Sequence, residues 1–388
     1  MAIDNKDKKI LNVPPLRFPE FTEEWKAEQL DNIATLSKGI GISKEQLSED
    51  GEPCILYGEL YTKYKSEIIK QVESKTDING SKLKRSKAND VIIPCSGETA
   101  VDIATARCVP FDNILFGGDL NVISLHQYDG AFMSYQLNGK RKYDIARVAQ
   151  GVSIVHLYGE HLKAIKTYNP TLPEQQKIAK LLSLLDDRID TQNKIIEKLQ
   201  SLIKGLRVCC MQRVYGNNVY LSEIAQIYQP QTISSTELTE DGFLVYGANG
   251  IIGKYKDYNH ETEQICITCR GNTCGMVNYT KPMSWITGNA MVINTDKYQD
   301  KVCKRYLYHY LSAYNFNSII SGSGQPQIVR TPLEKLKITL PTISEQKQKA
   351  IIFDKIQDKI DINHKVLNLY IGQKQYLCLL YTSDAADE

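Results

Sequence analysis

The chain has 388 residues, of which 42% are hydrophobic and 24% are charged, and its formal net charge is +2. This composition is typical of an ordinary globular protein, and the length predicts two or three domains of about 150 residues each. The lysine-rich start MAIDNKDKKILN is not a secretory signal, and no apolar run approaches the roughly 18 residues that cross a bilayer, so we expect a cytoplasmic protein with no membrane partner.

Residues 1–13 are predicted to be an N-terminal tail, and residues 14–170 a first globular domain. Short β-rich phrases such as CILYG and VIIPCSG, separated by Gly, Asn and Asp, predict a mixed, mainly β domain.

Residues 171–210 are predicted to form a long helix, which begins in the phrase PTLPEQQKIAKLLSLLDDRID from Pro170. Proline suits the first turn of a helix, and Glu174 places negative charge near the positive helix end. Apolar residues then recur at steps of three and four, which predicts a packed seam with one polar interruption at Gln192. The seam residues are Ile178, Leu182, Leu185, Ile189, Gln192, Ile196, Leu199 and Ile203.

A second, mainly β domain is predicted for residues 211–340. Its phrase QICITCRGN and the following residues hold three of the ten cysteines, at positions 266, 269 and 274. Only half of a zinc pattern is present, so we interpret them as buried strand thiols and expect no metal. The glycines of GANGIIG lack the dinucleotide-binding spacing, and we interpret this phrase as a loop between strands.

A second long helix is predicted for residues 341–377, because PTISEQKQKAIIFDKIQDKID repeats the first helix start. Glu174 and Glu345 lie 171 positions apart, and the match continues without a gap. Ser344 is the expected N-cap of this copy. The equivalent seam residues are Phe353, Ile356, Ile360, Asn363, Leu367 and Tyr370. A polar residue at the same seam position of both copies suggests a register device, with Gln192 paired to Asn363.

The globular segments repeat more weakly. Leu30 and Ile33 match Leu221 and Ile224, while Ile154 and Leu162 are set against Ile328 and Leu336. We infer that a half-molecule was duplicated. The predicted fold class is therefore α+β: two mixed, mainly β domains joined by two long helices packed as an antiparallel coiled coil, with a pseudo-twofold internal repeat. About 33 residues per helix would give a rod of about 50 Å.

Residues 378–388 have no counterpart in the first half. Read back through the genetic code, CLLYTSDAADE resembles a translated transposase sequencing adapter. We expect this segment to be a non-native, adapter-derived tail that is dispensable for function.

The chain resembles the specificity (S) subunit of type I restriction–modification systems. The resemblance is carried by PPLRFPEFTEEW near the start, by GISKEQLSEDGEPCILYGELYTKY, by the first helix start, and by SGSGQPQIVR before the second. It runs from about Pro14 to about Leu377.

The resemblance implies two target-recognition domains, each reading one half of a bipartite DNA target, with the helices fixing the spacer. A rod of about 50 Å spans roughly 14 base pairs. The implied partners are double-stranded DNA, methyltransferase (modification) subunits and a restriction/translocase subunit, in a complex that is a type I site-specific deoxyribonuclease and adenine-specific DNA methyltransferase. The chain itself is expected to bind no cofactor, and S-adenosylmethionine, ATP and Mg²⁺ are expected on the partner subunits.

No catalytic motif appears in the sequence: there is no GxxxxGK[ST], no HExxH and no Asn/Asp-Pro-Pro-aromatic motif. We therefore expect a chain that is not an enzyme by itself. Two alternatives stay open, a coiled-coil adaptor without DNA specificity and a stand-alone DNA-cleaving enzyme.

Candidate DNA-binding residues are basic or polar side chains in predicted loops, where they could meet phosphates or base edges. Each one alone is also compatible with an ordinary solvated charge. The candidates are Tyr61, Lys63, Lys65, Lys82, Lys84, Arg85 and Lys87 in the first domain and Arg270, Asn272 and Thr273 in the second.

Overall fold

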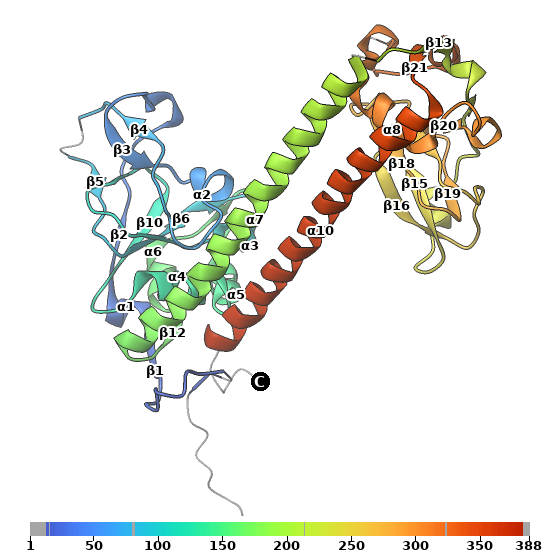
Figure 1. Ribbon diagram of the computed structural model, residues 1–388. Coiled ribbons are helices and arrows are strands. Elements are labelled where there is room, and N and C mark those ends of the chain that lie inside the picture. The colour runs from blue at the N-terminus through green and yellow to red at the C-terminus, as the bar shows by residue number, and fades with distance from the viewer. Residues whose placement is uncertain (1–12, 15, 80–81, 213, 323, 383–388) are drawn as a thin grey trace, which may run out of the picture. The chain divides into compact units, whose positions relative to one another are not determined.

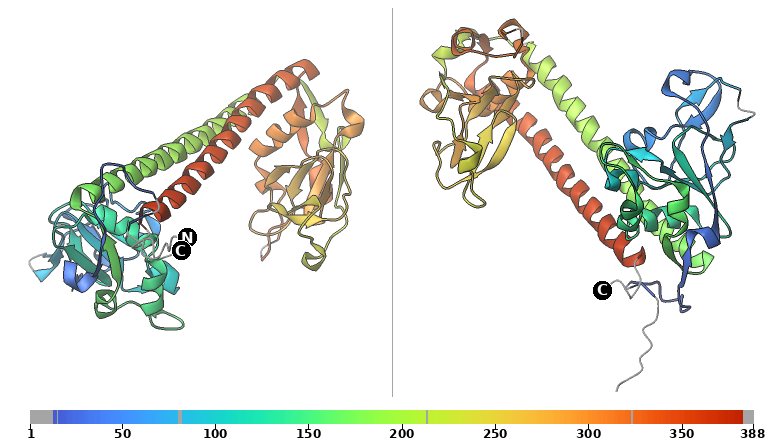
Figure 2. Two further views of the ribbon diagram at one scale, coloured as in Figure 1. Left: turned by 90° about the horizontal axis from the view of Figure 1, so that it is seen from below. Right: turned by 180° about the vertical axis from the view of Figure 1, so that it is seen from behind.

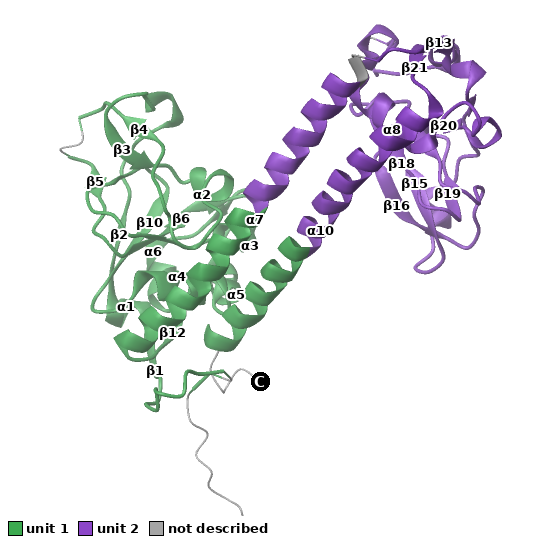
Figure 3. Cartoon of the chain, in the orientation of Figure 1, with its two compact units in different colours: residues 1–192, 366–388 green, residues 193–365 purple. Residues whose placement is uncertain are grey.

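A computed structural model describes residues 13–14, 16–79, 82–212, 214–322 and 324–382 (Figure 1). The chain forms two compact units (Figure 3): unit 1 holds residues 1–192 and 366–388, and unit 2 holds residues 193–365. Each long helix is thus shared between the units, whereas the sequence pattern had indicated that the helices are separate segments. Of the predicted tail 1–13, only Val13 lies within the described residues. No helix in the described ranges is long and apolar enough to cross a membrane.

Unit 1 is built on small sheets covered by short helices. Its strands are β1 (Lys26–Gln29), β2 (Ala34–Lys38), β3 (Glu52–Ile55), β4 (Lys75–Thr76), β5 (Lys84–Arg85), β6 (Asp90–Pro94), β7 (Ser96–Gly97), β8 (Arg107–Val109), β9 (Leu115–Phe116), β10 (Leu120–Leu125), β11 (Val155–His156) and β12 (Lys166–Asn169). Its helices are α1 (Leu30–Ile33), α2 (Glu59–Thr62), α3 (Ala100–Ile103), α4 (Gly130–Asn138), α5 (Lys142–Val148) and α6 (Gly159–Lys163), followed by the first part of α7 (Leu172–Gln212).

The central sheet of unit 1 is antiparallel, with the strand order β2-β10-β6-β8. Its middle strand β6 is made of branched apolar residues, and Val91, Ile92 and Ile93 are fully buried. A second sheet has the order β4-β3-β9-β5, in which β3 and β9 run parallel. The strands β1 and β12 pair beside the start of α7.

Unit 2 repeats this plan. Its strands are β13 (Asn217–Tyr220), β14 (Gln226–Tyr228), β15 (Phe243–Gly247), β16 (Gly250–Tyr255), β17 (Ile265–Thr268), β18 (Val277–Tyr279), β19 (Ser284–Ile286), β20 (Ala290–Asn294) and β21 (Lys337–Leu340). Its helices are the last part of α7, α8 (Lys304–Ala313), α9 (Arg330–Glu334) and the first part of α10 (Ile343–Thr382).

The sheet order β14-β20-β17-β18 corresponds strand for strand to β2-β10-β6-β8, and the pairs β1–β12 and β3–β9 recur as β13–β21 and β15–β19. Leu30 and Leu221 are both fully buried, and their amides donate to Ile165 O and Leu336 O. The predicted duplication is therefore confirmed.

One detail of the predicted repeat is wrong. Ile154 is 60% exposed, whereas Ile328 is 2% exposed. The residue that matches Ile328 is the buried Leu157: its amide donates to Cys95 O, as the Ile328 amide donates to Cys269 O. The offset of 171 residues between the helix starts thus extends back to Leu157, and the predicted alignment was shifted by three residues.

A buried glutamine fixes the start of each long helix. The Gln175 side chain donates to Pro170 O at 2.8 Å and accepts from the amide of Asp129, the N-cap of α4, at 2.8 Å. Gln346 does the same in unit 2, with Pro341 O at 2.9 Å and the Cys303 amide, at the start of α8, at 2.8 Å. The repeated Glu-Gln phrase therefore ties each long helix to the helix that packs beside its sheet.

The acidic residues of the two helix starts differ in role. Ser344 is not the N-cap of α10, because the helix already begins at Ile343. The residue that precedes the helix is Thr342, and its amide donates to the Glu345 carboxylate at 3.0 Å. Such a reciprocal cap satisfies amides that the first helical turn leaves free. Glu174 is instead fully buried and accepts two hydrogen bonds of 2.7 Å from the Arg17 guanidinium.

The two long helices pack against each other in opposite directions within each unit (Figure 2). In unit 1, Lys374 in the last part of α10 pairs with Asp186 in the first part of α7 at 2.6 Å. In unit 2, Ile203 of α7 shares one hydrophobic cluster with Phe353 and Ile360 of α10. The antiparallel packing is confirmed in each unit. The Asn363 amide donates to Lys359 O of its own helix at 2.6 Å, and a pairing with Gln192 stays a prediction.

A polar side chain in the middle of α4 or α8 bridges the two long helices. In unit 1 the Tyr135 hydroxyl donates to Asp186 at 2.6 Å, and the Lys374 ammonium lies 5.6 Å from the Tyr135 ring centroid. In unit 2 the fully buried His309 contacts Asp354 of α10 through Nε2 at 2.8 Å, and it accepts from Arg207 of α7 through Nδ1.

The C-terminal boundary differs from the expectation. The helix α10 does not end at Leu377 but continues to Thr382. Cys378 and Tyr381 are buried in a cluster with Trp25, Phe132 and Tyr135. This packing argues against the expectation that residues 378–382 are dispensable. Residues 383–388 lie outside the described part, and the nucleotide origin of the whole segment stays a prediction.

We predict that Gln175→Met lowers the free energy of unfolding by about 1–3 kcal/mol, because a buried amide and a buried carbonyl lose their partners. Gln176→Met is the matched control, since the neighbouring Gln176 is exposed on the same helical turn. Urea denaturation measures both variants. Equal stabilities of the two variants would contradict the structural role of Gln175.

We also predict a pH effect in unit 2. Burial lowers the pKa of His309, while its hydrogen bond to Asp354 acts in the opposite direction. Below about pH 6.5 the unfolded chain gains a proton that folded His309 resists, so stability is lost as the pH falls from there toward the folded pKa. His309→Gln keeps a donor and an acceptor without titrating, and should lose less stability between pH 7 and pH 5. His364→Gln, at an exposed position of α10, is the control; an unchanged pH profile of His309→Gln contradicts the prediction.

Candidate nucleic-acid interface

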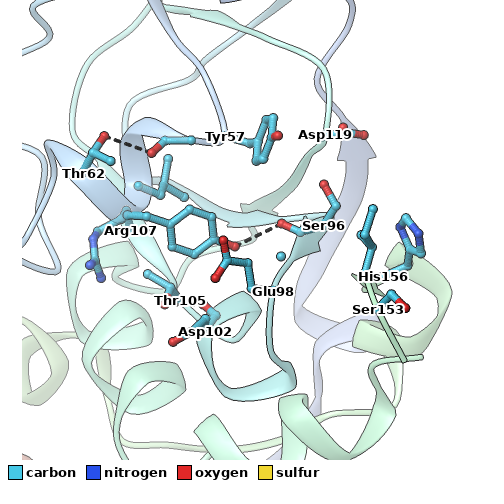
Figure 4. Close-up of a pocket in the computed structure, with 15 residues that line it drawn as sticks. Tyr57, Thr62, Ser96, Glu98, Asp102, Thr105, Arg107, Asp119, Ser153 and His156 are labelled. Atoms are coloured by element: carbon cyan, nitrogen blue, oxygen red, sulfur yellow. Dashed lines mark hydrogen bonds between the residues drawn. The ribbon is translucent and has the colours of Figure 1, made fainter. Parts of the chain in front are cut away.

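Three loops of unit 1 meet around an open pocket of about 970 Å³ (Figure 4). The first loop follows β3, the second follows β7, and the third leads into β11. The Tyr61 hydroxyl ties the first loop to the second by donating to Ser96 O at 3.1 Å. The strand pairing of Ser96 with His156 ties the second loop to the third.

The pocket wall is polar and partly aromatic. Figure 4 shows Tyr57 and Asp119 above Ser96, with Glu98 and Asp102 below it. The lining includes Tyr57, Tyr61, Ser96, Glu98, Asp102, Asp119, Ser153 and His156. Hydroxyls, carboxylates and an imidazole ring are groups that can exchange hydrogen bonds with base edges.

Two of these aromatic rings have defined neighbours. Burial raises the pKa of Tyr61, and the nearby Asp102 carboxylate adds to the effect. The His156 ring stacks on Tyr158, which also contacts the His161 ring and the Lys38 ammonium, the latter 5.5 Å from the Tyr158 ring centroid. Strand β2 therefore ends in an exposed cation near the third loop.

Unit 2 brings the equivalent three loops together. The Thr273 hydroxyl of the loop after β17 donates to Asn249 in the turn between β15 and β16. The Gly271 amide donates to Pro326 O at 3.0 Å, and Arg270 pairs with Gln327 as Ser96 pairs with His156. Gly271 has φ +87°, which favours glycine where the chain turns away from the strand.

The hairpin loops of the two units also correspond. Gln150 pairs with His156 in unit 1, and Ser321 pairs with Gln327 in unit 2. Each unit therefore presents one face of three loops built on the same strands, with different side chains at equivalent positions.

Tyr61 was predicted in a loop but lies in the short helix α2, from which it lines the pocket. Arg270, Asn272 and Thr273 follow β17 and are exposed in the three-loop face of unit 2, as predicted for loop residues. The phrase GANGIIG is a hairpin between β15 and β16, as predicted. Whether any of these residues contacts DNA stays a prediction.

The basic candidates of unit 1 are elsewhere or already engaged. Lys63 pairs with the buried Glu59 at 2.7 Å and donates to Ser74 at 2.7 Å. Arg85 lies in the edge strand β5, and its guanidinium donates two hydrogen bonds to the Glu52 carboxylate, of 2.6 and 3.0 Å. Lys84 is half-buried in the same strand, while Lys65, Lys82 and Lys87 are exposed. Gly80 and Ser81, which precede this cluster, lie outside the described residues.

The cysteines of unit 2 are structural. Cys266 lies in β17 and Cys269 just after it, and both are 1% exposed. Burial raises the pKa of the Cys266 thiol, which keeps it protonated. Cys274 is only half-buried. Across the described ranges, no group of three or more His, Cys, Asp or Glu side chains is arranged to hold a metal ion.

Sequence reasoning missed Glu98, Asp102, Asp119, Ser153 and His156. Their positions in the sequence are far apart, and the candidate residues were chosen mainly for positive charge, which carboxylates do not have. The phrase QGVSIVH did carry a usable cue, because its counterpart SGSGQPQ was recognised in the second half.

Each unit of the duplicated fold presents one polar face formed by three loops. This arrangement is the one expected of a protein with two recognition domains. The family model described as "Type I restriction modification DNA specificity domain" matches twice, at residues 22–201 and 217–369. The chain therefore belongs to the type I restriction–modification DNA specificity family, as a specificity subunit with two recognition domains.

Individual relatives agree with this assignment. The chain is 31% identical to the Type I restriction enzyme EcoprrI specificity subunit of Escherichia coli over 37% of this chain and 36% of that subunit. It is 24% identical to the Type I restriction enzyme MjaVIII specificity subunit of Methanocaldococcus jannaschii over 93% of this chain and 92% of that subunit.

The fold is similar to that of the type I restriction–modification S subunit from M. genitalium, with a TM-score of 0.66, 18% identity, and coverage of 96% of this chain and 99% of that one. A second similar chain comes from a solved type I R-M system studied for complex assembly and conformational transition, with a TM-score of 0.56 and 14% identity, covering 92% of this chain and 97% of that one. These comparisons support a DNA sequence-recognition subunit and give no support to an adaptor without DNA specificity or to a stand-alone nuclease.

We predict that the two neighbouring lysines Lys63 and Lys65 behave differently. Lys63→Met should lower the free energy of unfolding by about 1–2 kcal/mol, because Glu59 loses its cation. Lys65→Met should leave stability unchanged and reduce the salt dependence of duplex binding by about one unit of slope, as expected for a phosphate contact. Urea denaturation and salt-dependent binding measure the two effects; an unfolding defect in Lys65→Met would refute this assignment.

Proposed function

We propose that each unit reads one half of a bipartite DNA target through its three-loop face, and that the long helices fix the spacer between the halves. The observation that carries this proposal is the equivalence of the two faces: the same strands present loops 57–62, 96–102 and 150–156 in unit 1 and loops 246–250, 270–275 and 321–327 in unit 2. Two equivalent readers in one chain suit a target with two separate parts.

Partner docking is proposed for the long helices. Apolar side chains on them remain exposed, and exposed apolar residues beyond a scattered few indicate an interaction surface. On α7 these include Leu184, Ile195 and Leu202, and on α10 they include Ile351, Ile362, Leu369 and Tyr376. The proposed occupants are methyltransferase subunits, joined by a restriction/translocase subunit, in a deoxyribonuclease and adenine-specific DNA methyltransferase complex in the cytoplasm. In this proposal S-adenosylmethionine, ATP and Mg²⁺ are bound by those partners.

Methyl transfer tests the proposal directly. The purified chain, its modification subunits and the mixture are each incubated with genomic DNA and S-adenosylmethionine. We expect methylation at one bipartite motif only in the mixture, and a steep loss of duplex affinity with salt. Methylation by the chain alone, or methylation by the modification subunits without it, overturns the proposal.

The role of the helices is tested by lengthening both together. Lys194 and Lys365 are equivalent positions, 171 residues apart, close to where the chain passes between the units. Four residues inserted after each add about one helical turn, or about 6 Å, while keeping the antiparallel packing in phase. We expect a longer non-specific spacer with both half-sites unchanged, read from the methylated motif; an insertion after Lys194 alone is the control that breaks the packing. A changed base preference within either half-site would contradict a spacer role.

A further inference from the structure

The two three-loop faces carry different hydrogen-bonding groups at equivalent positions. Ser96 of unit 1 corresponds to Arg270 of unit 2, because both pair with the third loop of their unit. Two residues further on, Glu98 corresponds to Asn272. At the first position a hydroxyl corresponds to a guanidinium, which only donates, and at the second position a carboxylate, which only accepts, corresponds to an amide, which does both. A role for this difference rests on the proposed function, in which these faces meet DNA.

In unit 2 the backbone that carries the Arg270 side chain is held in place. The backbone pairing of Arg270 with Gln327 and the bond from the Gly271 amide to Pro326 O fix the strand end, while the Arg270 side chain is exposed. A guanidinium has only donors, in a planar fork that matches the O6 and N7 acceptors of guanine. A base with this pattern in the major groove is the best partner for Arg270.

In unit 1 the acceptor stands in a pocket whose exposed carboxylates make it acidic, while the Arg107 guanidinium in the pocket wall is buried and donates to Tyr64 O and Ala106 O. Glu98 is exposed at the pocket, together with the carboxylates of Asp102 and Asp119. The Asp102 carboxylate already accepts from the Thr99 hydroxyl at 2.7 Å, whereas Glu98 projects from the turn after β7. Negative charge next to DNA is tolerated where it meets a donor, and the major-groove donors of DNA are the amino groups of cytosine and adenine.

We propose that the two half-sites are read by opposite chemistry: Arg270 recognises a guanine in the half bound by unit 2, and Glu98 accepts from the amino group of a cytosine or adenine in the half bound by unit 1. Both are specificity-determining residues that touch the base directly. The phosphate contacts come from other side chains, such as Lys38 and Lys65.

The test uses the complex of the full chain with its modification subunits and a duplex library whose central segment is fully randomised. Bound duplexes are sequenced for the wild type and for the variants Arg270→Lys, Arg270→Gln and Glu98→Gln. Arg270→Lys keeps the charge but loses the fork, and Arg270→Gln has the donor and acceptor that suit adenine. Lys297→Gln and Glu49→Gln, at exposed positions away from the loops, are the matched controls.

We expect Arg270→Lys to lower the preference for guanine about tenfold at one position of one half-site, and Arg270→Gln to move that position toward adenine. Glu98→Gln should change one position of the other half-site only. If the wild type selects a bipartite motif and the Arg270 and Glu98 variants select the same motif, the base assignments are wrong while the proposed function stands. If the wild type selects no bipartite motif, the proposed function itself fails.

Discussion

A buried glutamine at the start of each long helix is the contact on which the rest of the structure depends. Gln175 and Gln346 each join three segments: the end of a strand pair, the first turn of the long helix, and the start of the helix beside the sheet. A side-chain amide can do this because it both donates and accepts. Each contact fixes the direction in which a long helix leaves its unit, and the strand pairs β1–β12 and β13–β21 complete the same junction.

The two units keep this junction and differ in what surrounds it. Tyr135 and His309 occupy the same place between the long helices, yet one uses a hydroxyl with Asp186 and the other an imidazole with Asp354 and Arg207. The loop faces differ in the same way, with carboxylates in unit 1 and Arg270 and Asn272 in unit 2. A shared framework with separate side chains lets the two faces change independently, because neither face takes part in the junction.

The sequence predicted the framework well because its signals are local and repeated. The helix starts and the matched pair Leu30–Leu221 rest on spacing along the chain, and the structure has them in equivalent places. The errors have physical causes. Thr342 replaced Ser344 as the cap because α10 begins at Ile343, which puts the capping contact to Glu345 two residues before Ser344. Ile154 was aligned by residue type although Leu157 is the one that is buried.

The interface was less accessible to sequence reasoning. The sequence does not distinguish a basic side chain that is free from one that is paired. Lys63 and Arg85 were therefore chosen as DNA-binding candidates although they form ion pairs with Glu59 and Glu52. The pocket residues of unit 1 come together only through the pairing of β7 with β11, which joins segments about 60 positions apart along the sequence. The segment 378–382 was judged by its missing counterpart and its back-translated codons, while its burial depends on Trp25 and Phe132, which lie far earlier in the chain.

The central claim is that each half of the chain is an independent reader. The most direct test replaces residues 14–170 by the equivalent domain of another type I specificity subunit and determines the methylated motif of the reconstituted complex by sequencing. The account predicts that one half of the motif changes to that of the donor subunit, while the other half and the spacer are retained. A change in both halves would show that the two units read the target jointly, and would contradict it.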